Sequence, residues 1–166
     1  MRTLLPFIDA GKAREAFMAF VLPGIMSAIA DVHVKRPHLH VVALKPGVPY
    51  CQTDKLPVLF EHQVGNSAEW EWPYDKYASG KARITWRTGL SSRDVLMTKP
   101  HLMERGDPRY WGSAIIDGVI VGVSGVEPHF DEMFARMAAA AICAEATHYA
   151  TLLSALGDDA PDFLPI

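Results

Sequence analysis

The apolar positions between Trp111 and Glu132 fall into two short runs that meet at Asp117-Gly118. Both residues tolerate the positive φ that a tight hairpin turn requires, so this dipeptide between apolar runs predicts a β-hairpin. After Ser124-Gly125, Pro128 suits the first turn of a helix. The segment from there to about residue 148 is apolar over much of its circumference, which indicates a helix buried on more than one side.

The N-terminal third carries a helical pattern. From residue 11 to about 34, apolar residues recur at three- and four-residue steps, which favours helix. Pro23 lacks an N–H and clashes with the preceding turn, so the pattern predicts a kink or two abutting helices there.

Strand signals follow in the next segment of the chain. Residues 40–44 and 57–64 are short apolar runs with β-branched and aromatic residues, and they predict two strands.

The middle of the chain predicts one longer helix and then an irregular region. Asn66 or Ser67 can cap a helix that extends past residue 84, with Pro73 near its true start. Residues 89–110 give mixed signals with several prolines and glycines, which indicates loop with short helical turns.

Strands in the middle and near the end, separated and flanked by helices, predict an α+β layered domain with a mainly antiparallel sheet. At 166 residues, 49% of them hydrophobic, the chain is long enough for one domain with a core. We therefore expect a single domain over residues 1–166, with an N-terminal helical region at 11–34 and a tail at 157–166.

Charge and cysteine content narrow the function classes. The net charge of −3 gives no overall attraction to nucleic acid. Cys51 and Cys143 lie far apart and outside any C-x-x-C arrangement, which favours free thiols in a reducing compartment. Residues 1–17 do not form a convincing signal peptide, and Pro23-Gly24 and Asp31 interrupt the most apolar stretch. We expect a soluble, cytoplasmic protein that binds neither nucleic acid nor membrane.

Three histidines form a candidate metal site. His38 and His40 are two residues apart at the entrance to a predicted strand, so both side chains face the same way. If the next strand pairs with it, His62 can supply a third nitrogen, which suits zinc or iron. The alternative is that these histidines mark a solvated strand entrance.

A second candidate site combines a glycine turn with cationic residues. Backbone N–H groups at Ser124-Gly125, ahead of a helix, can meet a carboxylate or phosphate, or the glycines can simply permit a tight turn. Lys81, Arg83, Arg87 and Arg93 fit a positive cleft that faces a carboxylate, or a solvated helix face.

The chain resembles the HbpS/GlcG family over roughly residues 56–147. The C-terminal positions that carry the resemblance are Gly112, Asp117, Gly118, Gly122, Ser124, Gly125, Asp131 and Glu132. Upstream, Lys81-Ala82 resembles the K-A pair of the family's central helix, and Ser91-Ser92 a serine pair of its haem-degrading branch. Where many members carry Gly-Gly, this chain has Trp111-Gly112, whose indole would limit the volume of a pocket.

The resemblance implies a profilin-like α-β-α sandwich of about five strands, the fifth placed in residues 48–54, and a homo-oligomer. It also implies a ligand, either haem or a small organic acid, held between the central helix and the glycine turn. The ligand-binding residues expected on this basis are Lys81, Ser92, Arg93, Gly112, Ser124, Gly125, His129 and Asp131. His129 is the candidate axial ligand to haem, because it lies at a helix start beside the turn.

Two other functions remain open from the sequence. One is an enzyme of small-molecule acid catabolism in which Lys81, Arg93 or a histidine transfers a proton. The other is a structural or regulatory module without a ligand.

Overall fold

The computed structural model describes residues 8–52 and 55–153, so the tail expected at 157–166 lies outside the described residues. The elements are α1 (Ala10–Phe20), α2 (Leu22–Ala30), β1 (Leu39–Leu44), β2 (Val58–Val64), η2 (Ser67–Glu69), α3 (Tyr74–Thr88), α4 (Ser92–Thr98), η3 (Pro100–Leu102), β3 (Ser113–Ile116), β4 (Val119–Ser124) and α5 (Pro128–Leu153).

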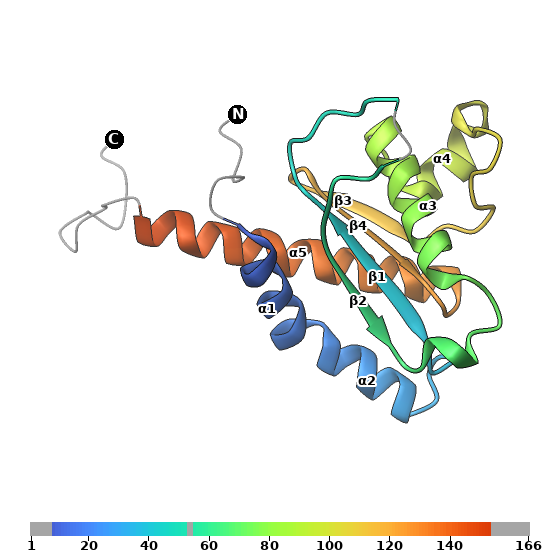
Figure 1. Ribbon diagram of the computed structural model, residues 1–166, viewed down its shortest axis with the longest axis horizontal. Coiled ribbons are helices and arrows are strands. Elements are labelled where there is room, and N and C mark those ends of the chain that lie inside the picture. The colour runs from blue at the N-terminus through green and yellow to red at the C-terminus, as the bar shows by residue number, and fades with distance from the viewer. Residues whose placement is uncertain (1–7, 53–54, 154–166) are drawn as a thin grey trace.

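The strands form one antiparallel sheet in the order β2-β1-β4-β3. Helix α3 packs on one face, across β1 and β4, while α1 and α5 cover the other face (Figure 1). The predicted α+β class with a mainly antiparallel sheet is therefore confirmed. Residues 48–52, within the range predicted for a fifth strand, form no strand, and residues 53 and 54 are outside the described part of the chain.

The predicted hairpin is confirmed at Asp117-Gly118. The two residues have φ of 47° and 84°, the left-handed values that a type I′ turn requires at both central positions. The turn sets the β3–β4 register, in which Ile116 pairs with Val119. Four residues beyond the turn, a Cβ at Gly122 would clash with the carbonyl oxygen of Ala78, so this glycine lets α3 lie directly against β4.

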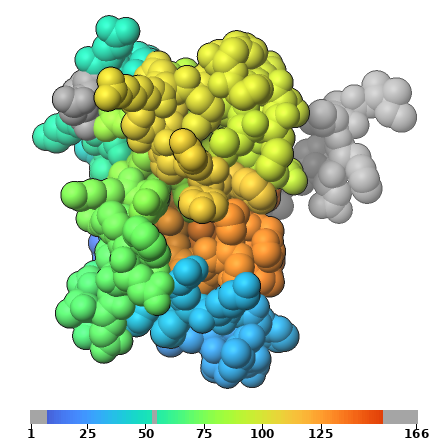
Figure 2. Space-filling model, turned by 90° about the vertical axis from the view of Figure 1, so that its right-hand side faces the viewer, coloured from blue at the N-terminus to red at the C-terminus, as the bar shows by residue number. Residues whose placement is uncertain are grey.

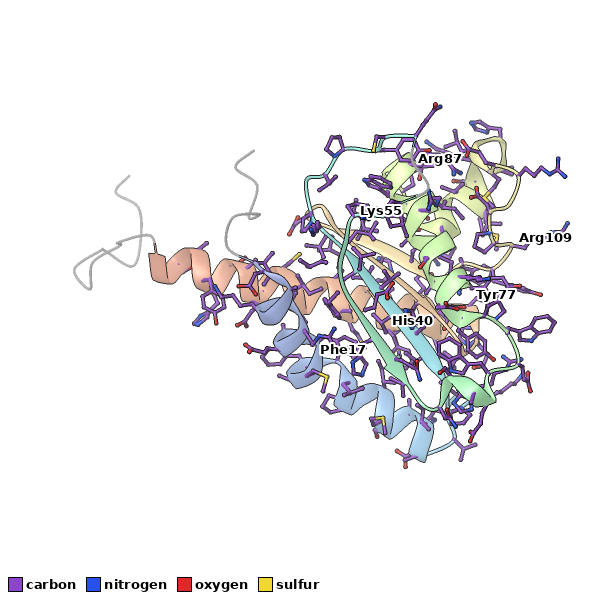
Figure 3. The ribbon with its side chains drawn as sticks, in the orientation of Figure 1. Phe17, His40, Lys55, Tyr77, Arg87 and Arg109 are labelled. Atoms are coloured by element: carbon purple, nitrogen blue, oxygen red, sulfur yellow. The ribbon has the colours of Figure 1, made fainter. Side chains whose placement is uncertain are left out.

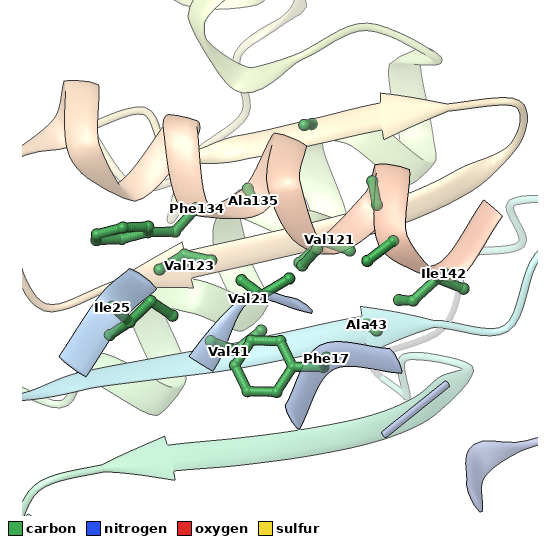
Figure 4. Close-up of a cluster of buried hydrophobic side chains, with 14 of the residues drawn as sticks. Phe17, Val21, Ile25, Val41, Ala43, Val121, Val123, Phe134, Ala135 and Ile142 are labelled. Carbon is green, nitrogen blue, oxygen red and sulfur yellow. The ribbon is translucent and has the colours of Figure 1, made fainter. Parts of the chain in front are cut away.

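The N-terminal helices abut at residue 21, as the proline predicted. Pro23 lies in the first turn of α2, where its missing N–H leaves no intrahelical bond unmade. Phe17, Val21 and Ile25 point from these helices into a core shared with β1, β4 and α5 (Figure 4). This core fixes the position of the long C-terminal helix over the sheet.

The stretch Ala10–Ala30 is apolar enough, with a mean hydropathy of 1.4, and long enough to cross a membrane by length and composition alone. A core helix and a signal sequence share these properties. It is the single such stretch in the part of the chain that the structure describes, which therefore does not have the organisation of a multi-span membrane protein.

Both cysteines are free, as predicted: Cys51 is exposed and Cys143 is buried. The predicted irregular region at 89–110 contains the short elements α4 and η3. Its return loop is held by Arg87 of α3, which donates hydrogen bonds to Asp107 at 2.6 Å and to the Leu102 carbonyl at 2.9 Å. These contacts anchor the loop at the end of α3, and Pro108 packs against Gly80 in the middle of the helix.

Candidate functional site

A buried ion pair joins α3 to the start of α5. The Nζ of Lys81, in a side chain 1% exposed, lies 2.8 Å from Oδ2 of Asp131. The same ammonium donates hydrogen bonds to the carbonyl of Val123 at 2.9 Å and to Oγ of Ser124 at 3.2 Å. All three protons of the ammonium are therefore donated, so Lys81 connects α3, β4 and α5.

The carboxylate of Asp131 is held from both sides. Its Oδ1 accepts a hydrogen bond from the N–H of Val126 at 3.2 Å, at the glycine turn before α5. Burial raises the pKa of Asp131 to about 6, although Lys81 and the backbone donors oppose that shift. Burial likewise lowers the pKa of Lys81, against the attraction of Asp131. Desolvation is thus the main cost of this pair, and its hydrogen bonds offset part of it.

Gly112 and Ser92 pack behind the ion pair. Gly112 has φ of 148°, and a Cβ there would lie 2.7 Å from Cβ of Asp131 and 2.9 Å from Nζ of Lys81. Oγ of Ser92 accepts hydrogen bonds from the N–H groups of Gly112 and Ser113, each at 3.1 Å. Ser92 therefore holds in place the backbone that the ion pair needs, and a glycine is required at position 112.

A cavity of about 560 Å³ opens beside the ion pair, and we call it the central cavity. Its volume lies within the range of about 300–1,000 Å³ that is usual for small-molecule sites. On this face, chain segments near residues 35, 75 and 110 surround the β4–α5 turn (Figure 2). The lining residues are Lys35, Arg36, Trp72, Tyr74, Tyr77, Lys81, Tyr110, Ser124, Gly125, Val126, Glu127, Pro128 and Asp131.

Over the described residues, Tyr74 is the member of this lining whose buried polar atom has no hydrogen-bond partner. The residue is 4% exposed, and its hydroxyl is buried with no hydrogen-bond partner among the described residues. Burial raises the pKa of Tyr74, so the phenol stays protonated and able to donate. A buried hydroxyl left unpaired costs about 1–3 kcal/mol, which a ligand that accepts its proton would recover.

The cavity rim adds positive charge. Lys35 and Arg36 come from the loop before β1. Arg36 lies 3.5 Å from the exposed carboxylate of Glu71, and the side chain of Lys35 has no ion pair in the described structure. Glu127, the acidic lining residue other than Asp131, accepts a hydrogen bond from the backbone N–H of Lys35 at 3.4 Å.

The structure brings together four of the eight predicted ligand-binding residues: Lys81, Ser124, Gly125 and Asp131 line the central cavity. Gly112 and Ser92 support them from behind, as described above. Trp111, expected to limit the pocket, is not part of the lining.

The remaining predicted residues lie elsewhere. Arg93 forms an ion pair with Glu132 at 3.2 Å and is about half exposed. His129 is exposed, with its ring 4.5 Å from that of Phe130. The expected cationic cleft does not form as one surface either, because Arg87 is bound to Asp107 and Arg83 lines a separate cavity with Lys45 and Lys55.

The three histidines do not converge. Residues that pair directly across antiparallel strands share a face, and His62 pairs with Val41 while His40 pairs with Gln63. His62 therefore faces α1, where its ring centroid lies 5.1 Å from that of Phe17, and His40 faces the other side of the sheet, toward Trp70. Phe17 and His40 are labelled in Figure 3.

The third histidine, His38, precedes β1 and lies 3.7 Å from Glu69. Over residues 8–52 and 55–153, no group of three or more His, Cys, Asp or Glu side chains is arranged to hold a metal ion. The predicted three-histidine site is therefore not formed.

Haem fits this lining poorly. Haem iron takes His, Cys, Met or Tyr as axial ligand, and the lining supplies tyrosine alone of these four residue types. Ligation through tyrosine uses the phenolate, whereas burial holds Tyr74 in its protonated form.

Sequence reasoning missed the aromatic and charged residues of the lining: Lys35, Arg36, Trp72, Tyr74, Tyr77, Tyr110 and Glu127. One signal was present, because Tyr74, Tyr77 and Lys81 are spaced by three and four residues and so share one face of a helix. No local pattern connects them with Lys35 or Tyr110, which reach the cavity through the tertiary fold.

Comparisons of the chain with protein-family models, with curated proteins and with solved structures found no match.

Proposed function

We propose that the protein binds a small organic acid in the central cavity. The observation that carries this proposal is that Tyr74, whose buried hydroxyl has no hydrogen-bond partner in the described part of the chain, lines a cavity that also has two cations at its rim. A carboxylate is the complementary group, because it only accepts hydrogen bonds and is attracted by Lys35 and Arg36. The hydroxyl of Ser124, whose oxygen already accepts from Lys81, still has its own proton to donate.

The geometry favours binding over catalysis by Lys81. A lysine nucleophile or base must be neutral and have a free lone pair, whereas the Lys81 ammonium donates three hydrogen bonds and pairs with Asp131. Its role in this proposal is to position Ser124 and the turn that ends at Val126. The acid-catabolism enzyme, with proton transfer by Lys81, Arg93 or a histidine, is therefore the less supported alternative.

The HbpS/GlcG resemblance and the profilin-like, roughly five-stranded topology remain part of the proposal. A sheet with helices on both faces and a glycine turn beside the Lys81–Asp131 pair support it. We include a homo-oligomer, because Trp72 and Phe20 are large exposed apolar side chains. We also include a cytoplasmic location, supported by the two free cysteines.

A thermal-shift screen tests the proposal. The purified full chain is heated with a panel of monocarboxylic and dicarboxylic acids, and a binding acid raises Tm through mass action. The Lys35→Gln/Arg36→Gln variant should lose most of that rise, while Lys99→Gln, which changes an exposed lysine outside the cavity, should keep it. If no acid raises Tm, or if the Lys35→Gln/Arg36→Gln variant shows the same rise in Tm as the wild type and Lys99→Gln, the proposal is wrong.

Hemin is titrated in parallel as the competing ligand. If hemin gives a saturable Soret shift that survives in Tyr74→Phe, and no acid raises Tm, then haem and not an organic acid is the ligand. The proposal predicts the reverse pattern, in which acids raise Tm and hemin shows no saturation.

A further inference from the structure

A second cavity, of about 360 Å³, adjoins the central cavity and shares Tyr77 and Tyr110 with it; we call it the flanking cavity. It is lined by Pro73, Lys76, Tyr77, Gly80, Gly106, Asp107, Pro108, Arg109 and Tyr110. The two tyrosines therefore stand between the two spaces. Tyr77 comes from α3, and Tyr110, 62% exposed, comes from the loop before β3.

The wall between α3 and this loop is built by specific contacts. A Cβ at Gly80 would lie 2.8 Å from Cγ of Pro108, so the glycine lets the loop pack against the helix. On the far side of the loop, Asp107 is bound by Arg87 at 2.6 Å and accepts a hydrogen bond from the N–H of Glu104 at 2.8 Å. The loop that carries Arg109 and Tyr110 is thus anchored independently of any ligand.

The charges of the two cavities are arranged in two separate groups. Lys76 and Arg109 line the flanking cavity, and neither side chain has an ion pair or hydrogen bond among the described residues. The acid beside them, Asp107, is already neutralised by Arg87. Tyr77 and Arg109 lie at the same side of the molecule (Figure 3).

Lys35 and Arg36 form the other group, at the rim of the central cavity. There, Asp131 is neutralised by Lys81, which leaves Glu127 as the acidic lining residue without a cationic partner in the described chain.

We propose that the acid bound by this protein is an elongated dianion with a planar middle. One acid group lies by Lys35 and Arg36, the planar part lies against Tyr77 and Tyr110, and the second acid group lies by Lys76 and Arg109. Aromatic side chains favour offset or edge-on contact with a planar ring, and the separated cations select for two acid groups rather than one. This inference rests on the proposed function, because it names the class of acid that the same site takes.

Calorimetric titration of the full chain with matched acids tests the inference. Terephthalate and biphenyl-4,4′-dicarboxylate are compared with benzoate and biphenyl-4-carboxylate, which keep the ring system and lack one carboxylate. Exposed ion pairs are individually weak, worth up to about fivefold in affinity, so the better-fitting diacid should bind tighter than its monoacid by up to about fivefold for each cation that its second carboxylate meets. That preference should shrink as salt is raised, because salt screens exposed charges.

The variants locate the second acid group. Lys76→Gln/Arg109→Gln should lower diacid affinity to that of the monoacid and leave monoacid affinity unchanged. Lys35→Gln/Arg36→Gln should weaken both members of each pair, and Lys99→Gln neither.

If monoacids bind as tightly as diacids, or if the Lys76/Arg109 variant keeps the diacid preference, the inference is wrong while the proposed function stands. If no acid of either kind binds, both are wrong.

Discussion

Replacement of Lys81 by methionine tests the structural basis of the site. Methionine keeps much of the length and apolar stem of lysine but removes the ammonium. Three hydrogen bonds are lost, and Asp131, 1% exposed, is left as a buried carboxylate with backbone donors alone. Removal of one partner from a buried ion pair costs about 3–5 kcal/mol. Because whole domains are stable by about 5–15 kcal/mol, this loss would be a large fraction of the total.

Urea unfolding followed by circular dichroism measures the change. Lys76→Met, an exposed lysine on the same helix, is the matched control and should change the unfolding free energy by less than about 0.5 kcal/mol. Lys81→Met/Asp131→Asn should recover part of the loss, because the uncompensated charge is gone. A loss below about 1 kcal/mol for Lys81→Met would refute the view that this pair joins α3 to α5.

Three further predictions concern the same site. Because the pKa of Asp131 is raised from 3.8 to about 6, the folded protein keeps a proton that the unfolded chain loses, so the contribution of Asp131 to the unfolding free energy should fall as the pH rises from about 4 to 6, by on the order of 3 kcal/mol. Asp131→Asn should flatten that part of the pH profile, and an unchanged slope contradicts the assignment. Gly112→Ala should lower the free energy of unfolding in urea by about 1–3 kcal/mol, since φ at this position is 148° and the new Cβ would crowd Asp131. A change of less than about 0.5 kcal/mol, which is typical of surface substitutions, would argue against this crowding. Tyr74→Phe should raise the unfolding free energy by about 1 kcal/mol, because it removes a buried hydroxyl with no partner in the described chain. The same variant should show a smaller acid-induced rise in Tm. If the unfolding free energy falls together with that rise, the hydroxyl has a structural role instead.

Local signals in the sequence were sufficient for most of the elements. Asp117-Gly118 predicted the hairpin because a type I′ turn needs positive φ at two successive residues, and Pro23 predicted the break between α1 and α2 because it lacks an N–H. Residues 48–52 were different. A fifth strand was expected there only from the family resemblance, and these residues form no strand in the structure, because a strand also needs a partner edge, which the sequence does not reveal.

The site was predictable only where its residues lie close in sequence. Ser124, Gly125 and Asp131 surround one turn, and the family resemblance added Lys81. The ion pair itself spans 50 residues, so no periodicity connects its two members.

The histidine prediction failed for a related reason. Whether His40 and His62 share a face depends on the β1–β2 register, and the long connection between these strands does not fix that register. A shift by one residue would have turned His62 to the side of His40.

The most direct test of the central claim is a crystal structure of the protein with the acid that raises Tm most. The account predicts the acid in the central cavity, with a carboxylate oxygen within hydrogen-bond distance of the Tyr74 hydroxyl and the side chain of Lys35 or Arg36 beside it. An acid bound elsewhere, with Tyr74 still unpaired and the central cavity filled by solvent alone, would contradict it.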